Sequence, residues 1–117
     1  MRRTRIYTEQ SLAPGTTVVL DGNSGHYLAR VLRLAVAAPV TLFNGDGLDY
    51  MGAVCAIERD RVAVQVADAS QVNNETPLKI TLVQAVSRGE RMDYTLQKAT
   101  ELGVACIQPV TSQRVEV

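Results

Sequence analysis

A stretch of helical periodicity lies between two apolar runs near the end of the chain. Within residues 87–103 the apolar positions recur at intervals of four and three residues, at Met92, Leu96 and Ala99. This spacing places them on one stripe of a helix. Residues 78–86 and 105–110 are apolar runs of strand length. The segment therefore predicts a strand–helix–strand unit with parallel strands and a right-handed connection.

Both ends of this predicted helix carry known terminal signals. Ser87 and Glu90 have the spacing of a capping box, in which each side chain satisfies a backbone N–H of the first turn. Gly103 follows the last apolar residue, Leu102, at the place where a left-handed residue commonly ends a helix. We therefore expect one amphipathic helix with defined ends.

The first half of the chain alternates short apolar segments with turn residues. Strands are predicted at 5–7, 17–20, 39–44, 48–57 and 61–69, and the last of these alternates strictly, with valines on one side. The sequence Asn44-Gly45-Asp46-Gly47 predicts a hairpin turn, because its residues tolerate positive φ. A helix is predicted at 25–34, with Asn23 or Ser24 as its cap and with a buried face formed by Leu28, Val31 and Leu32.

The order of predicted elements changes after residue 72. Five short strands and one helix predict a small β-barrel over residues 1–72, and the polar, proline-containing stretch 70–77 resembles a linker. Residues 73–117 hold the strand–helix–strand unit. A parallel pair normally needs further strands and helices on both faces. We therefore expect the second part to be an incomplete α/β domain, the front of a larger one.

Composition and charge exclude only a few classes of protein. The apolar fraction of 46% is that of a globular protein. The chain has 12 basic and 12 acidic residues, so any nucleic-acid binding must depend on local clusters. No apolar run approaches the roughly 18 residues of a membrane span, and no signal peptide is recognised. We expect a cytoplasmic protein with no membrane contact, in which Cys55 and Cys106 are free, buried thiols.

The predicted helix at 25–34 carries three candidate phosphate-binding side chains. His26, Arg30 and Arg33 are spaced by four and three residues and are expected to share one helix face. Arginine is suited to forked phosphate contacts. A solvated helix surface is the alternative interpretation. As the only histidine, His26 is not expected to hold a metal.

Two further groups of cations add to these candidates. Arg2, Arg3 and Arg5 form a basic cluster that Arg30 and Arg33 could extend, unless it is only a solvated terminus. In the second half the cations are Arg88, Arg91, Lys98 and Arg114. Lys98 and Glu101 could instead form a surface pair. Arg114 follows a predicted parallel strand, where open α/β sheets bind their ligands.

No catalytic set is recognised in the sequence. There is no nucleophile with a partner base, no metal-ligand cluster and no glycine-rich phosphate loop. Catalytic residues are therefore left unassigned, and no metal is expected.

The strand–helix–strand segment also resembles a known family. LVQAVSRGERMDYTLQKATELGVACIQPV, followed by Ser112, Gln113 and Arg114, is similar to the start of the catalytic domain in the RsmE-like family. These are bacterial 16S ribosomal RNA methyltransferases of the SPOUT (trefoil-knotted) class, which modify uridine at N3. The run QKATELG is the most specific part, and HYLARVLR resembles the family's N-terminal signature.

This resemblance implies a fold and a function for the whole chain. It implies a PUA-like RNA-binding barrel followed by the first βαβ portion of a SPOUT methyltransferase domain. S-adenosylmethionine would be bound by a C-terminal region that this chain does not include, and the full-length protein would be a homodimer that acts on 16S ribosomal RNA or the small ribosomal subunit. We expect this chain alone to be inactive. The residues expected to contact RNA are Arg5, His26, Arg30, Arg33, Arg88, Arg91, Lys98 and Arg114.

Two other functions stay open at the level of sequence. One is a non-enzymatic RNA-binding module. The other is an unrelated α/β protein in which the barrel mediates protein contacts. Salt-dependent RNA binding would separate the first from the second.

Overall fold

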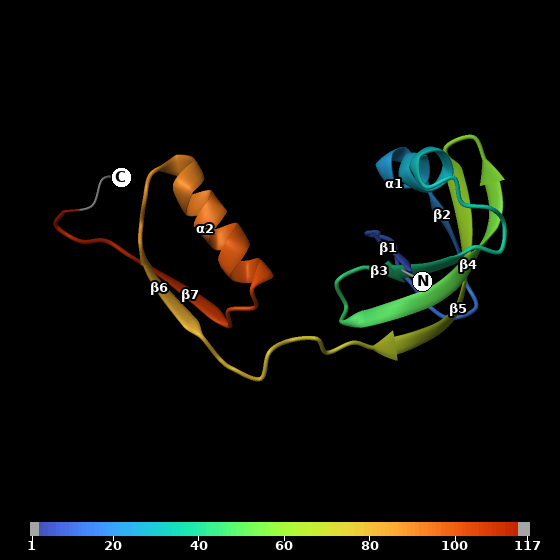
Figure 1. Cartoon of the computed structure of the whole chain (residues 1–117). Helices are drawn as coiled ribbons and strands as arrows, with labels where there is room; N and C mark the ends of the chain where they lie inside the picture. The colour runs from blue at the N-terminus through green and yellow to red at the C-terminus, as the bar shows by residue number, and fades with distance from the viewer. Residues whose placement is uncertain (1–2, 115–117) are drawn as a thin grey trace. The chain divides into compact units, whose positions relative to one another are not determined.

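The structure is a computed structural model that describes residues 3–114. The chain forms two compact units, and the division between them falls between Asn73 and Asn74 (Figure 1). Each unit has its own sheet and its own helix, so each is described by itself.

The first unit is built on a five-stranded mixed sheet. Its strands are β1 (Thr4–Tyr7), β2 (Thr17–Leu20), β3 (Pro39–Phe43), β4 (Leu48–Glu58) and β5 (Arg61–Gln71). The strand order is β1-β3-β4-β5-β2, in which β1 and β3 are parallel and the other neighbours are antiparallel. All five predicted strands are confirmed, with ends that differ by at most two residues.

The predicted closed barrel is not formed. Closure would require a hydrogen-bonded ladder between β1 and β2, the two ends of the strand order, and these strands are not neighbours in the sheet. β1 has four residues and runs parallel to β3. The long strands β4 and β5 bend at two bulges, between Met51 and Gly52 and between Val54 and Ala56. Bulges bend and twist a sheet, and here they curve it without closing it.

The core of the first unit lies on one face of this sheet. The alternation in β5 is confirmed, because Val62, Val64 and Val66 are all 1% exposed or less. Leu28 and Leu42 are fully buried against the same cluster. The predicted turn is also confirmed, with φ of 91° at Gly45 and 90° at Gly47. Only the positive φ of these glycines lets the chain reverse so tightly.

The helix of the first unit differs from its prediction. It starts as α1 (Gly22–His26) and continues as a π-helix, η1 (Tyr27–Val31), so it lies three residues earlier than expected. A π-turn is wider than an α-turn, which breaks the expected apolar face: Leu28 is buried, but Val31 is 60% exposed. The helix cap is Asp21, and it makes no side-chain capping bond. The predicted caps Asn23 and Ser24 are therefore wrong.

The second unit is the predicted strand–helix–strand unit. It consists of β6 (Thr81–Ala85), α2 (Gly89–Glu101) and β7 (Cys106–Val110), and the two strands are parallel. Ala99 is buried, while Met92 and Leu96 on the same stripe are half-buried, so the amphipathic pattern is confirmed. Gly103 has a φ of 87°, as predicted for the residue that ends the helix.

The predicted capping box of α2 is wrong. The helix begins two residues later than Ser87, its cap is Arg88, and no side chain caps it. The Ser87 hydroxyl lies 4.0 Å from the sulfur of Met92 instead. The spacing from Ser87 to Glu90 fits a capping box, but Ser87 lies one residue before the cap position.

The cysteines are free, as expected, but they are not buried. Cys55 and Cys106 are both exposed. Strand positions that alternate between two faces place one set of side chains outward, and the apolar composition of these strands concealed this. No helix in the described part of the chain is long and apolar enough to cross a membrane.

Candidate nucleic-acid interface

Two of the candidate side chains on the helix of the first unit, Arg30 and His26, converge on one carboxylate. Arg30 donates from Nε to Asp60 at 2.8 Å, and Nδ1 of His26 lies 3.6 Å from the other Asp60 oxygen. The hydrogen bond from Arg30 is the main cause that lowers the pKa of Asp60 below its ordinary value. The positive charge of Arg30 is therefore partly compensated by the turn between β4 and β5, although its side chain is 58% exposed.

Arg33 does not share a face with His26 and Arg30. It follows η1 and has a φ of 50°, so it belongs to the loop after the helix. Of the three side chains predicted to share one helix face, only His26 and Arg30 lie on the helix. Arg33 is exposed and makes no ion pair with any residue that the structure describes.

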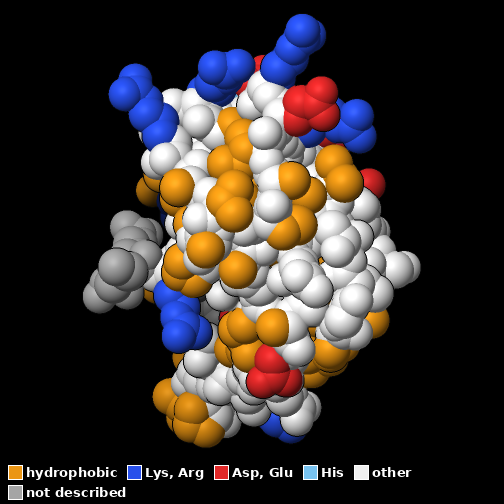
Figure 2. Space-filling view, turned by 90° about the vertical axis from the view of Figure 1, so that its right-hand side faces the viewer, with side chains coloured by type: hydrophobic (Ala, Val, Ile, Leu, Met, Phe, Trp, Pro, Cys, Tyr) orange, Lys and Arg blue, Asp and Glu red, His pale blue; other side chains and the backbone are white. Residues whose placement is uncertain are grey.

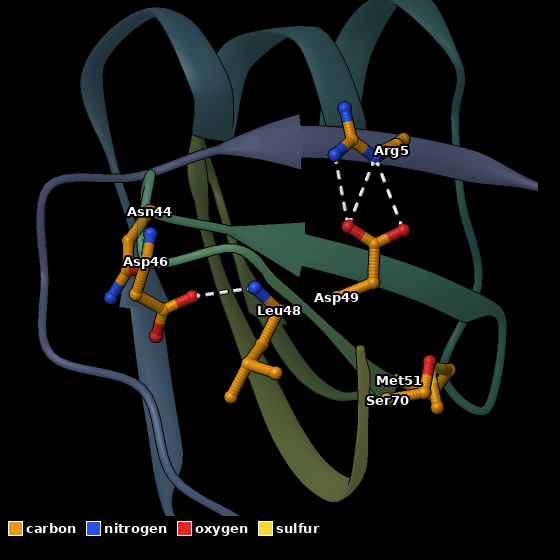
Figure 3. Close-up of polar contacts among 7 residues, drawn as sticks. All are labelled: Arg5, Asn44, Asp46, Leu48, Asp49, Met51 and Ser70. Atoms are coloured by element: carbon orange, nitrogen blue, oxygen red, sulfur yellow. Dashed lines mark hydrogen bonds and ion pairs between the residues drawn. The ribbon is translucent and has the colours of Figure 1, made fainter. Parts of the chain in front are cut away.

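Arg5 is held by a carboxylate of its own. Its guanidinium donates to Asp49 at 2.9 Å from one nitrogen and at 3.3 Å from another (Figure 3). The guanidinium carbon also lies 3.6 Å from the ring centroid of Phe43. Asp49 therefore compensates the charge that Arg5 would bring to the predicted patch with Arg30 and Arg33.

A pocket links the basic start of the chain to the helical segment. It has a volume of about 620 Å³ and is lined by Arg3, Thr4, Arg5, Tyr27 and Leu32. Arg3 is exposed there, while Arg2 lies outside the described residues. Figure 2 shows a face on which Lys and Arg side chains stand mostly at one end and hydrophobic side chains fill the middle. Asp and Glu side chains stand among them at that end, so the charge there is mixed.

An aromatic pair that the sequence analysis did not single out lies beside Arg5. Tyr7 of β1 and Phe43 of β3 are directly opposite in the parallel ladder, with ring centroids 5.5 Å apart. Tyr7 is 50% exposed. A signal was present in the sequence, because Tyr7 is two residues after Arg5 and strand periodicity places both on one face.

The cations of the second unit divide between the two ends of α2. Arg88 follows β6 and Arg114 follows β7, and the N–H of Val86 donates to Val110 at 2.8 Å, so both arginines leave the sheet at its carboxyl edge. Arg91 lies in the first turn of the helix at the same edge. This is the edge at which open α/β sheets bind ligands.

Lys98 is separated from the other three cations. It lies in the last turn of α2 and pairs with Glu101 at 3.1 Å, the surface pair that the sequence left as an alternative. Arg91 and Lys98 are seven residues apart, which is roughly 10 Å along a helix. They share a face but not one compact site.

The described residues form no recognisable catalytic centre. No group of three or more His, Cys, Asp or Glu side chains in residues 3–114 is arranged to hold a metal ion. Asp46 accepts hydrogen bonds from the Tyr50 hydroxyl and the Leu48 N–H. The Tyr50 bond is the main cause that lowers the pKa of Asp46, and it raises the pKa of Tyr50. This pair stabilises the turn between β3 and β4.

Comparison with known proteins assigns each unit to a domain type. Residues 20–67 match the family model of the RNA methyltransferase PUA domain, and residues 74–117 match that of the RNA methyltransferase domain. The ribosomal RNA small subunit methyltransferase E of Buchnera aphidicola (from Acyrthosiphon pisum) is 32% identical over 106 residues, which are 91% of this chain and 42% of that protein. This chain belongs to the ribosomal RNA small subunit methyltransferase E family.

Solved structures of the methyltransferase E family and of a related methyltransferase have the same fold. The Neisseria gonorrhoeae methyltransferase E, bound to S-adenosylmethionine, is 40% identical with a TM-score of 0.73, over 99% of this chain and 48% of that one. A Legionella pneumophila methyltransferase with bound S-adenosylmethionine is 40% identical with a TM-score of 0.74, over 100% of this chain and 48% of that one. This chain thus spans less than half the length of these relatives. Membership excludes the alternative of an unrelated α/β protein.

Proposed function

We propose that residues 1–72 are the RNA-binding domain, and residues 73–117 the first part of the catalytic domain, of a methyltransferase that acts on small-subunit ribosomal RNA. The observation that carries this proposal is the separate match of the two units to the PUA and catalytic domains of RNA methyltransferases. The names of the relatives support ribosomal RNA as the substrate. In this arrangement the chain positions RNA.

The reaction that we propose is the transfer of a methyl group from S-adenosylmethionine to N3 of a uridine. The likeness of QKATELG to the N3-specific family supports the position on the base. Related structures hold S-adenosylmethionine. The second unit fits that cofactor poorly by itself, because Ala99 is its only buried residue among those described. We assign the cofactor site to the part of the relatives' length that this chain does not span, where the SPOUT knot would lie.

The RNA contacts that we propose are of two kinds. Arg33 would contact RNA with an uncompensated charge. Arg5, Arg30 and His26 would contact RNA while they remain paired with Asp49 or Asp60. In the second unit, the residues at the carboxyl edge of the sheet would contact the RNA substrate: Arg88, Arg91 and Arg114. Lys98 would contact RNA further along α2. We also propose that the whole protein is a cytoplasmic homodimer.

The reaction is tested by reverse transcription of small-subunit ribosomal RNA after treatment with the whole protein that carries this chain. A methyl group on N3 blocks the pairing edge of uridine, so the reverse transcriptase should stop next to one uridine, and only when S-adenosylmethionine is supplied. Methylation that leaves reverse transcription unimpaired would contradict the N3 assignment. An absence of methyl incorporation into this RNA would contradict the enzyme assignment and leave the RNA-binding module.

A further inference from the structure

Three planar side chains line the outward face of the first unit's sheet. Arg5 and Tyr7 alternate with the half-buried Thr4 and Ile6 along β1, and Phe43 is the direct partner of Tyr7 on β3. Ile6 packs against the core on the opposite face. The core therefore does not account for the outward group of Arg5, Tyr7 and Phe43, which we call the planar cluster.

The side chains of the planar cluster pack against one another, with Phe43 between Tyr7 and Arg5. The rings of Tyr7 and Phe43 are 5.5 Å apart at an interplanar angle of 58°, and the Arg5 guanidinium lies 3.6 Å from the Phe43 centroid. Asp49 holds this guanidinium and is itself only 17% exposed, so the arginine is fixed over the ring. The side chain of Arg5 stays 50% exposed, and Tyr7 is also 50% exposed.

We infer that the planar cluster stacks unpaired bases of single-stranded RNA. Bases that are unstacked from a helix bind by stacking on aromatic rings and on arginine planes. Both kinds of surface are exposed here. Because Asp49 compensates the charge of Arg5, the contribution of the cluster is stacking and not phosphate neutralisation. This inference rests on the proposed RNA-binding function and names the form of RNA that the site takes.

The outward face has room for a neighbouring base. Next along β4 from Asp49 lies Met51, which lines an apolar pocket of about 560 Å³ together with Ala53 and Ala67. Small side chains leave the floor of this pocket open. A strand of RNA that stacks at Tyr7 could therefore continue across β4 and β5.

The test measures binding of the 117-residue chain to a single-stranded ribosomal RNA oligonucleotide and to the same sequence closed in a duplex. Tyr7→Leu removes a stacking surface and should weaken single-strand binding about 5- to 140-fold, as expected for the loss of one stacked base. Arg5→Lys keeps the charge and removes the plane, so it should also weaken binding. In both variants the dependence on salt should stay that of the parent, because no phosphate contact is lost.

Two further variants exclude a trivial loss of folding. Tyr7→Phe restores a ring and should regain most of the single-strand affinity. Tyr94→Leu removes a tyrosine that is 63% exposed on α2 and should bind as the parent does. Parent-like binding by Tyr7→Leu, or an equal loss in Tyr94→Leu, would overturn the stacking inference while RNA binding stands. If the parent binds no RNA, the proposed function fails together with it.

Discussion

At the scale of single residues, two of the candidate RNA-binding arginines of the first unit are paired with aspartates. Arg5 and Arg30 each have an aspartate within 2.9 Å, and Arg33 has no such partner among the described residues. A count of arginines thus overstates the positive field of this surface. The aspartates restrain the arginines in defined positions and reduce their pull on phosphate.

Asp60→Asn should therefore strengthen RNA binding. The substitution releases Arg30 and His26, so RNA affinity at low salt should rise. The affinity should also fall more steeply as salt increases, because one more cation is available to phosphate. Glu58→Gln makes the same change of charge in the same hairpin, but Glu58 has no ion pair among the described residues. RNA titrations of both variants across salt concentrations decide this. An unchanged affinity in Asp60→Asn would mean that Arg30 is remote from the RNA.

The same pair predicts a pH dependence of stability. The folded-state pKa of Asp60 is lowered from 3.8, mainly by the hydrogen bond from Arg30. A lowered pKa means that the contribution to stability is complete above the unfolded value and is lost as pH falls through the folded value. Between neutral pH and about pH 5 the pair should therefore stay intact. Asp60→Asn lacks this contribution at every pH, whereas the parent loses it as pH falls, so the stability difference between them should shrink at the lowest pH. Identical acid profiles of variant and parent would contradict it.

At the scale of elements, close approach decides where the first helix lies. A Cβ on Gly25 would lie 1.9 Å from the Asp60 carbonyl oxygen and 2.7 Å from that of Leu20. Only glycine lets α1 rest on the β4–β5 turn. This contact brings Arg30 within reach of Asp60, so the packing of the helix sets the geometry of the surface charges.

Gly25→Ala should destabilise the first unit by about 1–3 kcal/mol, the usual cost of overpacking. The obstructing atoms belong to the backbone, so no side-chain rotation relieves the clash. Ser24→Ala, one residue earlier in the same helix, should stay within about 0.5 kcal/mol of the parent. Urea unfolding measures both. Equal midpoints for Gly25→Ala and the parent would show that the helix can shift at little cost.

The sequence predicted the elements whose periodicity is simple. The valines of β5, the glycine turn at 45–47 and the helix stripe of α2 follow from spacing alone, and each is confirmed. The π-helix at Tyr27–Val31 and the uncapped start of α2 depend on contacts with distant strands, which periodicity does not record. For the candidate site, the sequence identified the arginines as candidate RNA-binding residues. Their aspartate partners and the Tyr7–Phe43 pair required the strand register.

At the scale of the whole molecule, the two units differ in how much they bury. The first unit has a core of eleven buried residues: Leu12, Val18, Leu20, Leu28, Val40, Leu42, Tyr50, Val54, Val62, Val64 and Val66. In the second, Leu78, Ile80, Val83 and Leu102 are at least 51% exposed. A two-stranded sheet is marginal without further packing.

Amide hydrogen exchange should therefore be faster in the second unit. Amides of β3, β4 and β5 should be protected to the global stability of the first unit, while those of β6 and β7 should exchange through local opening. The measurement uses the 117-residue chain at low protein concentration, which limits self-association of the exposed apolar residues. Equal protection of the two units under that condition would contradict the difference in burial.

The most direct test of the account is the affinity of this chain for small-subunit ribosomal RNA across a series of salt concentrations. We predict a linear fall of log affinity with log salt, because local cations displace counterions from phosphates. Arg33→Ala should reduce that slope by roughly 0.7–0.9, the loss of one contact, and Lys79→Ala, an exposed charge at the start of the second unit, should leave it unchanged. An absence of saturable binding at low salt, or an affinity that does not depend on salt, would contradict the assignment of the first unit as an RNA-binding domain.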